Sequence, residues 1–239
     1  MYNLRKYFSL DRDVVFLNHG SFGATPKPVF EQYIGWQIML EEQPVKFLGR
    51  DFDGLMNTAR AAVAAEVGSD ANDLVFVPNA THGVNIAARS IALNPGDEIL
   101  STDQEYGACE FAWDAVCKLS GAVYVRQPLG LPAGTQDQMA ETFLAGINER
   151  TKVIFISHIT SPTAVRFPVE QICAVAREKG IVTVVDGAHA YGQIPLDMKG
   201  IGADFYTSNC HKWALAPKGA AFLYVNPAWQ GKILSLIHI

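Results

Sequence analysis

The feature that most constrains the fold is a regular alternation of apolar runs and helix-length segments from residue 73 onward. Short runs rich in β-branched and apolar residues predict buried strands at 74–77, 98–101, 122–125, 152–157, 181–185, 203–207 and 220–225. Segments that predict helices separate many of them, at about 80–93, 107–119, 136–147 and 168–179. Strands that alternate with helices in this way form a mostly parallel sheet with right-handed crossovers. We therefore expect an α/β fold.

The segment before this region is expected to be mainly helical. Residues 14–25 combine an apolar run with a glycine-rich turn, which predicts a short strand that leads into a loop. Prolines at the first turn predict a helix over about 26–41, and an alanine-rich stretch predicts a second helix over about 51–67.

Composition excludes several classes of partner. The net charge is −5, without long runs of one sign, which gives no electrostatic basis for binding nucleic acid or an anionic membrane. No window reaches the roughly 20 apolar residues that cross a bilayer, and the N-terminus lacks the apolar core of a signal peptide. The 4 cysteines form no C-x-x-C pair, which argues against a metal site and favours free thiols in a reducing compartment. We expect a cytoplasmic protein with no bound metal.

Lys212 and Asp186 carry the main functional prediction. Lys212 follows the strand expected at 203–207, and Asp186 directly follows the apolar run at 181–185. A lysine in a partly dry site loses its proton readily and can attack a carbonyl to form a Schiff base, although a lone lysine is as often an ordinary surface residue. An ionised Asp186 could keep a pyridine nitrogen protonated, whereas a helix cap is the alternative role for a lone aspartate. Because the carboxyl ends of parallel strands share one rim of the sheet, the two together predict pyridoxal phosphate chemistry.

A phosphate site is expected at the same rim. Ala80 and Thr81 begin a predicted helix, and the unpaired N–H groups and dipole of a helix start favour an anion. An N-cap without any ligand is the alternative interpretation. Asn209 and His211 are candidates to complete the phosphate site.

Five other residues are candidates for the site, and all except Ser161 also have a structural interpretation. Tyr106 either packs as a core aromatic or stacks on a planar ring. His189 is either a satisfied interior histidine or a group that moves a proton near the Schiff base. Ser161 is a candidate to reach the phenolic oxygen of the cofactor. Asn18 and His19 suit a turn, and we also consider them as substrate contacts.

The motifs resemble those of one family. Asn79-Ala80-Thr81, Asp186-Gly187-Ala188-His189 and His211-Lys212-Trp213 resemble the class V aminotransferases, which are fold-type I pyridoxal phosphate enzymes. The segments 18–23 and 157–163 most resemble the isopenicillin N epimerase-like branch. The resemblance implies an aspartate aminotransferase-like large domain, a three-layer sandwich in which the strand at 220–225 is antiparallel.

The resemblance implies roles around the cofactor, pyridoxal 5′-phosphate. Lys212 would carry it as a Schiff base, and Asp186 would pair with its ring nitrogen. Thr81, Asn209 and His211 would face the phosphate.

Two positions favour the epimerase-like branch. Tyr106 takes the ring-stacking position, which is a histidine in cysteine desulfurases, and His189 takes a position that is glutamine there. Ser161 matches the position that contacts the phenolic oxygen.

Domain organisation also follows from the resemblance. We divide the chain into an N-terminal arm and helix at 1–50, a cofactor-binding large domain at 51–230, and an apolar, abruptly ending piece at 231–239. Family members continue into a small C-terminal domain that supplies an arginine for the substrate carboxylate, so we expect this chain to be truncated. Fold-type I enzymes act as homodimers, and the arm around Arg50 is expected to reach the partner's site.

The expected activity is chemistry at the α-carbon of an amino acid or an amino-acid-like substrate. With Lys212 as general base, the reaction would be epimerisation or transamination. β-Elimination of the cysteine desulfurase or selenocysteine lyase type is an alternative, and so is a non-catalytic fragment or binding module. A hydrolase that uses Asp186 and His189 is disfavoured because the sequence has no G-x-S-x-G elbow.

Overall fold

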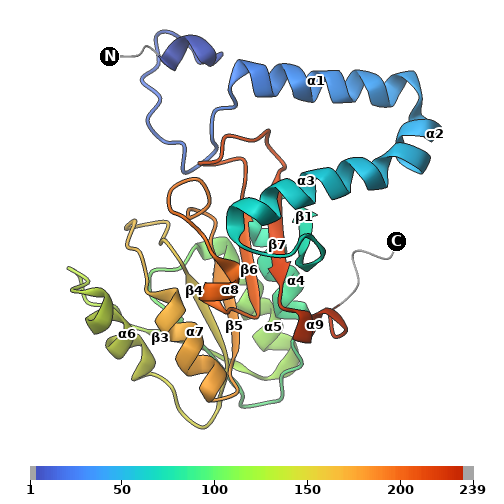
Figure 1. Ribbon diagram of the computed structural model, residues 1–239. Helices are drawn as coiled ribbons and strands as arrows, with labels where there is room; N and C mark the ends of the chain where they lie inside the picture. The colour runs from blue at the N-terminus through green and yellow to red at the C-terminus, as the bar shows by residue number, and fades with distance from the viewer. Residues whose placement is uncertain (1–3, 234–239) are drawn as a thin grey trace.

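A mostly parallel sheet forms the centre of the molecule. The computed structural model describes residues 4–233, in which 7 strands lie in the order β1-β7-β6-β5-β4-β2-β3 (Figure 1). The strands are β1 (Leu74–Val77), β2 (Glu98–Thr102), β3 (Val123–Gln127), β4 (Thr151–Ser157), β5 (Val182–Asp186), β6 (Phe205–Asn209) and β7 (Ala221–Val225). β7 pairs antiparallel with β1 and β6, and the other pairs are parallel. The predicted sheet with one antiparallel strand is confirmed.

Helices cover both faces of the sheet, as the predicted three-layer sandwich requires. One hydrophobic core contains side chains of α3 (Phe52–Val67), α6 (Gln136–Leu144), α7 (Val169–Glu178) and α8 (Met198–Ile201). The other contains side chains of α4 (Ala80–Ser90) and α5 (Gly107–Ser120), and α9 (Pro227–Gln230) packs against it. Side chains of β4 alternate between the cores: Ile154 and Ile156 join the first, and Val153 and Phe155 join the second. Burial on both faces explains why this strand reads as a continuous apolar run.

Local chemistry sets the ends of the helices. Thr135 and Gln138 form a capping box at the start of α6, and Gly68 and Gly121 end α3 and α5 with left-handed φ values of 66° and 77°. α4 and α6 each end three residues earlier than the sequence indicated. Within residues 4–233, no helix has the length and apolarity needed to cross a membrane.

The N-terminal segment forms an arm. The short η1 (Leu4–Tyr7) and a loop precede α1 (Lys27–Glu42), α2 (Pro44–Lys46) and the helical turn η2 (Phe47–Asp51), and the helices extend away from the sheet (Figure 1). The strand expected at 14–17 is wrong, because this run lies in an irregular loop with Val15 78% and Leu17 81% exposed. The run pairs with neither edge strand of the sheet, so its backbone has no ladder to join.

Candidate active site

Residues that follow five strands of the sheet converge on one cavity. The cavity has a volume of about 340 Å³ and lies at the carboxyl ends of the parallel strands, where ligands collect in such folds. It is lined by Ser21, Phe22, Asn79, Thr81, Tyr106, Ser157, Ile159, Ser161, Asp186, Ala188, His189, Asn209, His211 and Lys212. The structure thus brings together most of the residues that the sequence singled out.

Asp186 supplies a buried carboxylate. It ends β5 and is 3% exposed, and its oxygens accept hydrogen bonds from the Ala188 N–H at 2.9 Å and the Cys109 thiol at 3.5 Å. Burial raises the pKa of Asp186, while the Ala188 N–H and the positive charge of Lys212 oppose the rise. Among the described residues it forms no ion pair. A buried carboxylate without a cation is costly, so the site fits a ligand that brings a protonated nitrogen.

Lys212 lies beside His189. Lys212 Nζ is 3.1 Å from His189 Nε2, and the indole N–H of Trp213 donates to His189 Nδ1 at 3.3 Å. Burial lowers the pKa of Lys212, against the opposing charge of Asp186. Burial and the charge of Lys212 lower the pKa of His189 to about 4. Lys212 is therefore held in conditions that favour a neutral, nucleophilic amine.

The start of α4 forms the polar end of the cavity. Asn79 caps the helix by accepting the His82 N–H at 2.8 Å, and Asn209 accepts the Ala80 N–H at 2.9 Å. Thr81, which lies in the first turn of the helix, lines the cavity. The N-terminal end of the helix dipole favours an anion there. The predicted phosphate site thus has a helix start, one hydroxyl and a buried amide close together.

His211 has a defined tautomer in this arrangement. Its Nδ1 lies 3.0 Å from the Ala220 carbonyl oxygen, which can only accept, so Nδ1 carries a proton. Burial lowers the pKa of His211, with this hydrogen bond opposing. His211 can therefore donate a second hydrogen bond to a phosphate only when the anion stabilises its protonated form.

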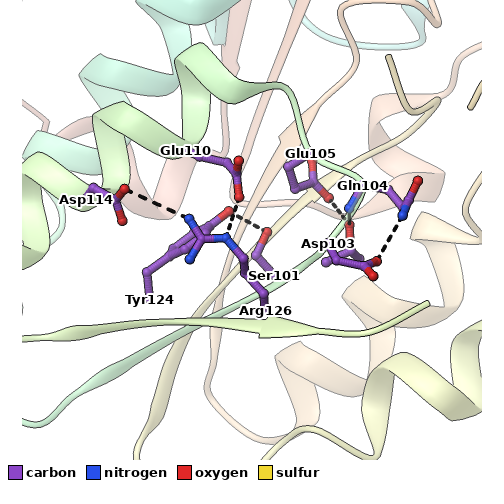
Figure 2. A network of polar contacts seen from close by, with 9 residues as sticks. Ser101, Asp103, Gln104, Glu105, Glu110, Asp114, Tyr124 and Arg126 are labelled. Carbon is purple, nitrogen blue, oxygen red and sulfur yellow. Dashed lines mark hydrogen bonds and ion pairs between the residues drawn. The ribbon is translucent and has the colours of Figure 1, made fainter. Parts of the chain in front are cut away.

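A second buried carboxyl group lies between β2 and α5. Glu105 accepts hydrogen bonds from the hydroxyls of Thr102 at 2.7 Å and Ser157 at 2.5 Å, and burial raises its pKa to about 7. Figure 2 shows Glu105 beside Gln104, and also the nearby contact in which Arg126 donates to Glu110. The pKa of Glu105 rises partly because of Asp186, so the two carboxyl groups influence each other.

Three of the predicted site residues do not line the cavity. Ala80 is buried and contributes through its N–H. The Asn18 side chain bonds Ser21, and His19 accepts the Ala24 N–H at 3.3 Å, so both serve their own loop. From this loop Ser21 and Phe22 reach the cavity instead.

Two contacts around the site were missed from the sequence. Cys109, whose thiol meets Asp186, lies one helical turn after Tyr106, and that spacing was the available signal. Trp213 belonged to a recognised motif but was given no role, and the structure places its indole N–H on His189.

Comparison with known proteins identifies the family. A model of the family described as "Aminotransferase class-V" matches residues 29–237. The chain belongs to this family. The family predicted from the motifs is confirmed.

The relatives include more than one activity. Isopenicillin N epimerase of Amycolatopsis lactamdurans is 38% identical over 226 residues, which cover 93% of this chain and 56% of that protein. Putative L-cysteine desulfhydrase 2 of Oryza sativa subsp. japonica is 35% identical over 230 residues, which cover 90% of this chain and 48% of that protein. A solved structure of a C-DES mutant with glycine covalently linked to the PLP cofactor has a TM-score of 0.86 at 26% identity, and covers 96% of this chain and 61% of that chain. The chain spans about half the length of the curated relatives it matches.

Proposed function

We propose that this chain binds pyridoxal 5′-phosphate in the cavity, and that the complete enzyme acts at the α-carbon of an amino acid or an amino-acid-like substrate as an epimerase or aminotransferase. The observation that carries the proposal is that Lys212 and the buried carboxylate of Asp186 line one cavity with the start of α4. When bound, the cofactor supplies an electron sink that stabilises negative charge on the α-carbon.

The residues present fit each part of the cofactor. The amine of Lys212 would hold its aldehyde carbon covalently, and Asp186 would keep its ring nitrogen protonated. Tyr106 is half exposed at the cavity and offers a ring face for stacking. Ser161 would donate to the phenolic oxygen, and the α4 start with Thr81 would bind the phosphate together with Asn209 and His211.

Proton transfer would depend on Lys212 and its neighbours. With substrate in the cavity, the Lys212 amine would be available to take the α-proton, and its lowered pKa would keep it competent as a base. Epimerisation also requires a donor on the opposite face. Tyr106 lines the cavity and carries a hydroxyl, so it is our candidate for that donor.

A second candidate function shares these first steps. The similarity to a putative L-cysteine desulfhydrase and to C-DES, which is described as a cystine C-S lyase, favours loss of a sulfur group from the β-carbon. In D₂O, an epimerase would return deuterium to the α-carbon of recovered substrate with inversion. A lyase would release sulfide, ammonia and a keto acid, and a transaminase would need an added keto acid to turn over.

Cofactor binding itself can be tested directly. Purified protein should show a visible absorption band, and borohydride reduction followed by peptide mass spectrometry should place the reduced cofactor on Lys212. Lys212→Ala should lose both signals, whereas Lys218→Ala, which changes a lysine that does not line the cavity, should keep them. An adduct on another lysine, or none, would leave the non-catalytic binding module as the better interpretation.

We also propose that the complete protein is a homodimer. α1 exposes large apolar side chains, including Phe30 at 50%, Ile38 at 53% and Met39 at 47%, which is typical of a surface that a partner covers. Arg50 lies on the same arm and would reach the partner's cavity. Sedimentation equilibrium measures this, and a fully cofactor-loaded monomer would contradict it.

A further inference from the structure

Trp213, His189 and Lys212 form a chain of contacts in which one proton position determines the next. Trp213 Nε1 lies 3.3 Å from His189 Nδ1, and His189 Nε2 lies 3.1 Å from Lys212 Nζ. The indole nitrogen can only donate, so His189 Nδ1 must accept and cannot carry a proton. A neutral imidazole then carries its proton on Nε2, which faces the lysine.

That tautomer restricts Lys212. An Nε2–H group is a donor, and it makes a hydrogen bond to Nζ only if the nitrogen has a free lone pair, as the neutral amine does. An ammonium group would set N–H against N–H. If His189 instead used the other tautomer to accept from an ammonium group, its Nδ1–H would oppose the Trp213 N–H. The indole and a charged Lys212 therefore compete for opposite tautomers of one ring.

The surroundings hold the imidazole in place. A Cβ atom built on Gly20 would lie 3.2 Å from His189 Cε1 and 3.2 Å from Trp213, so the N-terminal loop packs directly over the pair. Asp186 from β5 and Cys109 from α5 favour the protonated form of Lys212, whereas the neighbouring His211 has its pKa lowered by the charge of Lys212. The Nε2–H tautomer of His189 thus favours a neutral Lys212, whereas the carboxylate of Asp186 favours a charged Lys212.

We infer that Trp213 is a positioning residue, whose indole N–H holds His189 in the Nε2–H tautomer and thereby keeps Lys212 as a neutral amine ready to attack an aldehyde. This inference rests on the proposed function for the identity of the aldehyde, but the tautomer can be measured without any cofactor. It assigns the residue after the lysine a role in setting the lysine's protonation state.

The first experiment observes the tautomer. In the complete chain, labelled with ¹⁵N-histidine and freed of cofactor, long-range ¹H–¹⁵N correlation spectra distinguish Nδ1–H from Nε2–H. His189 should show the Nε2–H pattern, and Trp213→Phe should shift it toward Nδ1–H. An Nδ1–H tautomer in the unsubstituted protein would overturn the inference.

The second experiment measures the lysine. Trace acetylation across pH, read by mass spectrometry, gives the reactivity of Lys212 in the cofactor-free protein. Trp213→Phe should lower that reactivity about fivefold near neutral pH, the factor carried by one neutral hydrogen bond. The matched control is Trp229→Phe, which removes an indole N–H that donates to Asp204 at 2.9 Å outside the cavity, and it should leave Lys212 unchanged.

A double-substitution test protects against a general loss of folding. In a His189→Gln background no imidazole remains for the indole to orient, so adding Trp213→Phe should no longer change Lys212 reactivity. An equal effect of Trp213→Phe with and without His189 would show that the tryptophan acts through packing and would overturn the inference. Failure of borohydride trapping would refute the proposed function but would leave these cofactor-free measurements intact.

Discussion

Glu105 makes the stability of this protein depend on pH in a direction opposite to that of most carboxylates. Its side chain is buried and accepts a hydrogen bond from Ser157, which lines the cavity, and burial raises its pKa from 4.5 to about 7. Glu105 therefore binds its proton more tightly in the folded state than in the unfolded state. Between pH 4.5 and about 7, the carboxyl group is mostly protonated in the folded state and mostly ionised in the unfolded state. The contribution of Glu105 to stability is complete below pH 4.5 and is lost as pH rises through about 7.

Glu105→Gln keeps this side chain neutral at every pH. The difference between 4.5 and about 7 corresponds to about 3 kcal/mol, at 1.36 kcal/mol for each pH unit. The hydroxyls of Thr102 and Ser157 can rotate to serve a neutral amide, so the variant should keep both hydrogen bonds. We expect the variant to match the unsubstituted chain near pH 4.5 and to be more stable by about 3 kcal/mol at pH 8.

Urea denaturation of the cofactor-free protein at several pH values measures this difference. The control is Glu110→Gln, which removes a surface ion pair with Arg126 and should change the free energy of unfolding by about 0–1 kcal/mol. A Glu105→Gln variant that is no more stable than the unsubstituted protein at pH 8 would refute the reasoning. It would mean that the two hydroxyls hold Glu105 in its ionised form.

Two other predictions concern contacts around the site. In Gly23→Ala the new Cβ would clash with the carbonyl oxygens of His211 and Lys212 and strain the Gly23 N–H bond to His211, so the loop 14–25 should detach more readily by about 2–4 kcal/mol. Limited proteolysis should then cut this loop faster than in Gly35→Ala, whose Cβ meets no atom within 4 Å, and equal rates would contradict the packing. The thiol of Cys109 is buried and its pKa is raised by burial, so iodoacetamide should modify it only after unfolding, as mass spectrometry can show; rapid labelling of the native protein would contradict its contact with Asp186.

Most of the sheet could be predicted because its central strands are buried on both faces. Such strands appear in the sequence as continuous apolar runs, and alternation with helices determines that they are parallel. The run at 14–17 has the same composition but lies exposed, because a strand also requires a free sheet edge beside it. That requirement depends on the whole topology and is not encoded in the run itself.

The rim of the site was predictable for the same topological reason, whereas the charges on its residues were not. Parallel strands deliver Asp186 and Lys212 to one edge whatever their side chains contact. Their protonation depends on burial and on partners distant in sequence, such as Cys109 for Asp186 and His189 for Lys212. A motif therefore identifies which residues meet, and the packing determines which of them carry protons.

The glycines of the N-terminal loop show how packing changes the meaning of a motif. Residues 18–23 suggested turn chemistry and a contact to substrate through Asn18 or His19. In the structure, Gly23 approaches the backbone of His211 and Lys212 so closely that a Cβ would lie 2.2 Å from the Lys212 carbonyl oxygen, and Gly20 packs over His189. These glycines are required for close approach, so the loop acts on the site by holding Lys212 and His189 in position, while Ser21 and Phe22 between them form part of the cavity wall. A substitution in this loop should therefore alter the environment of the lysine before it alters any contact with substrate.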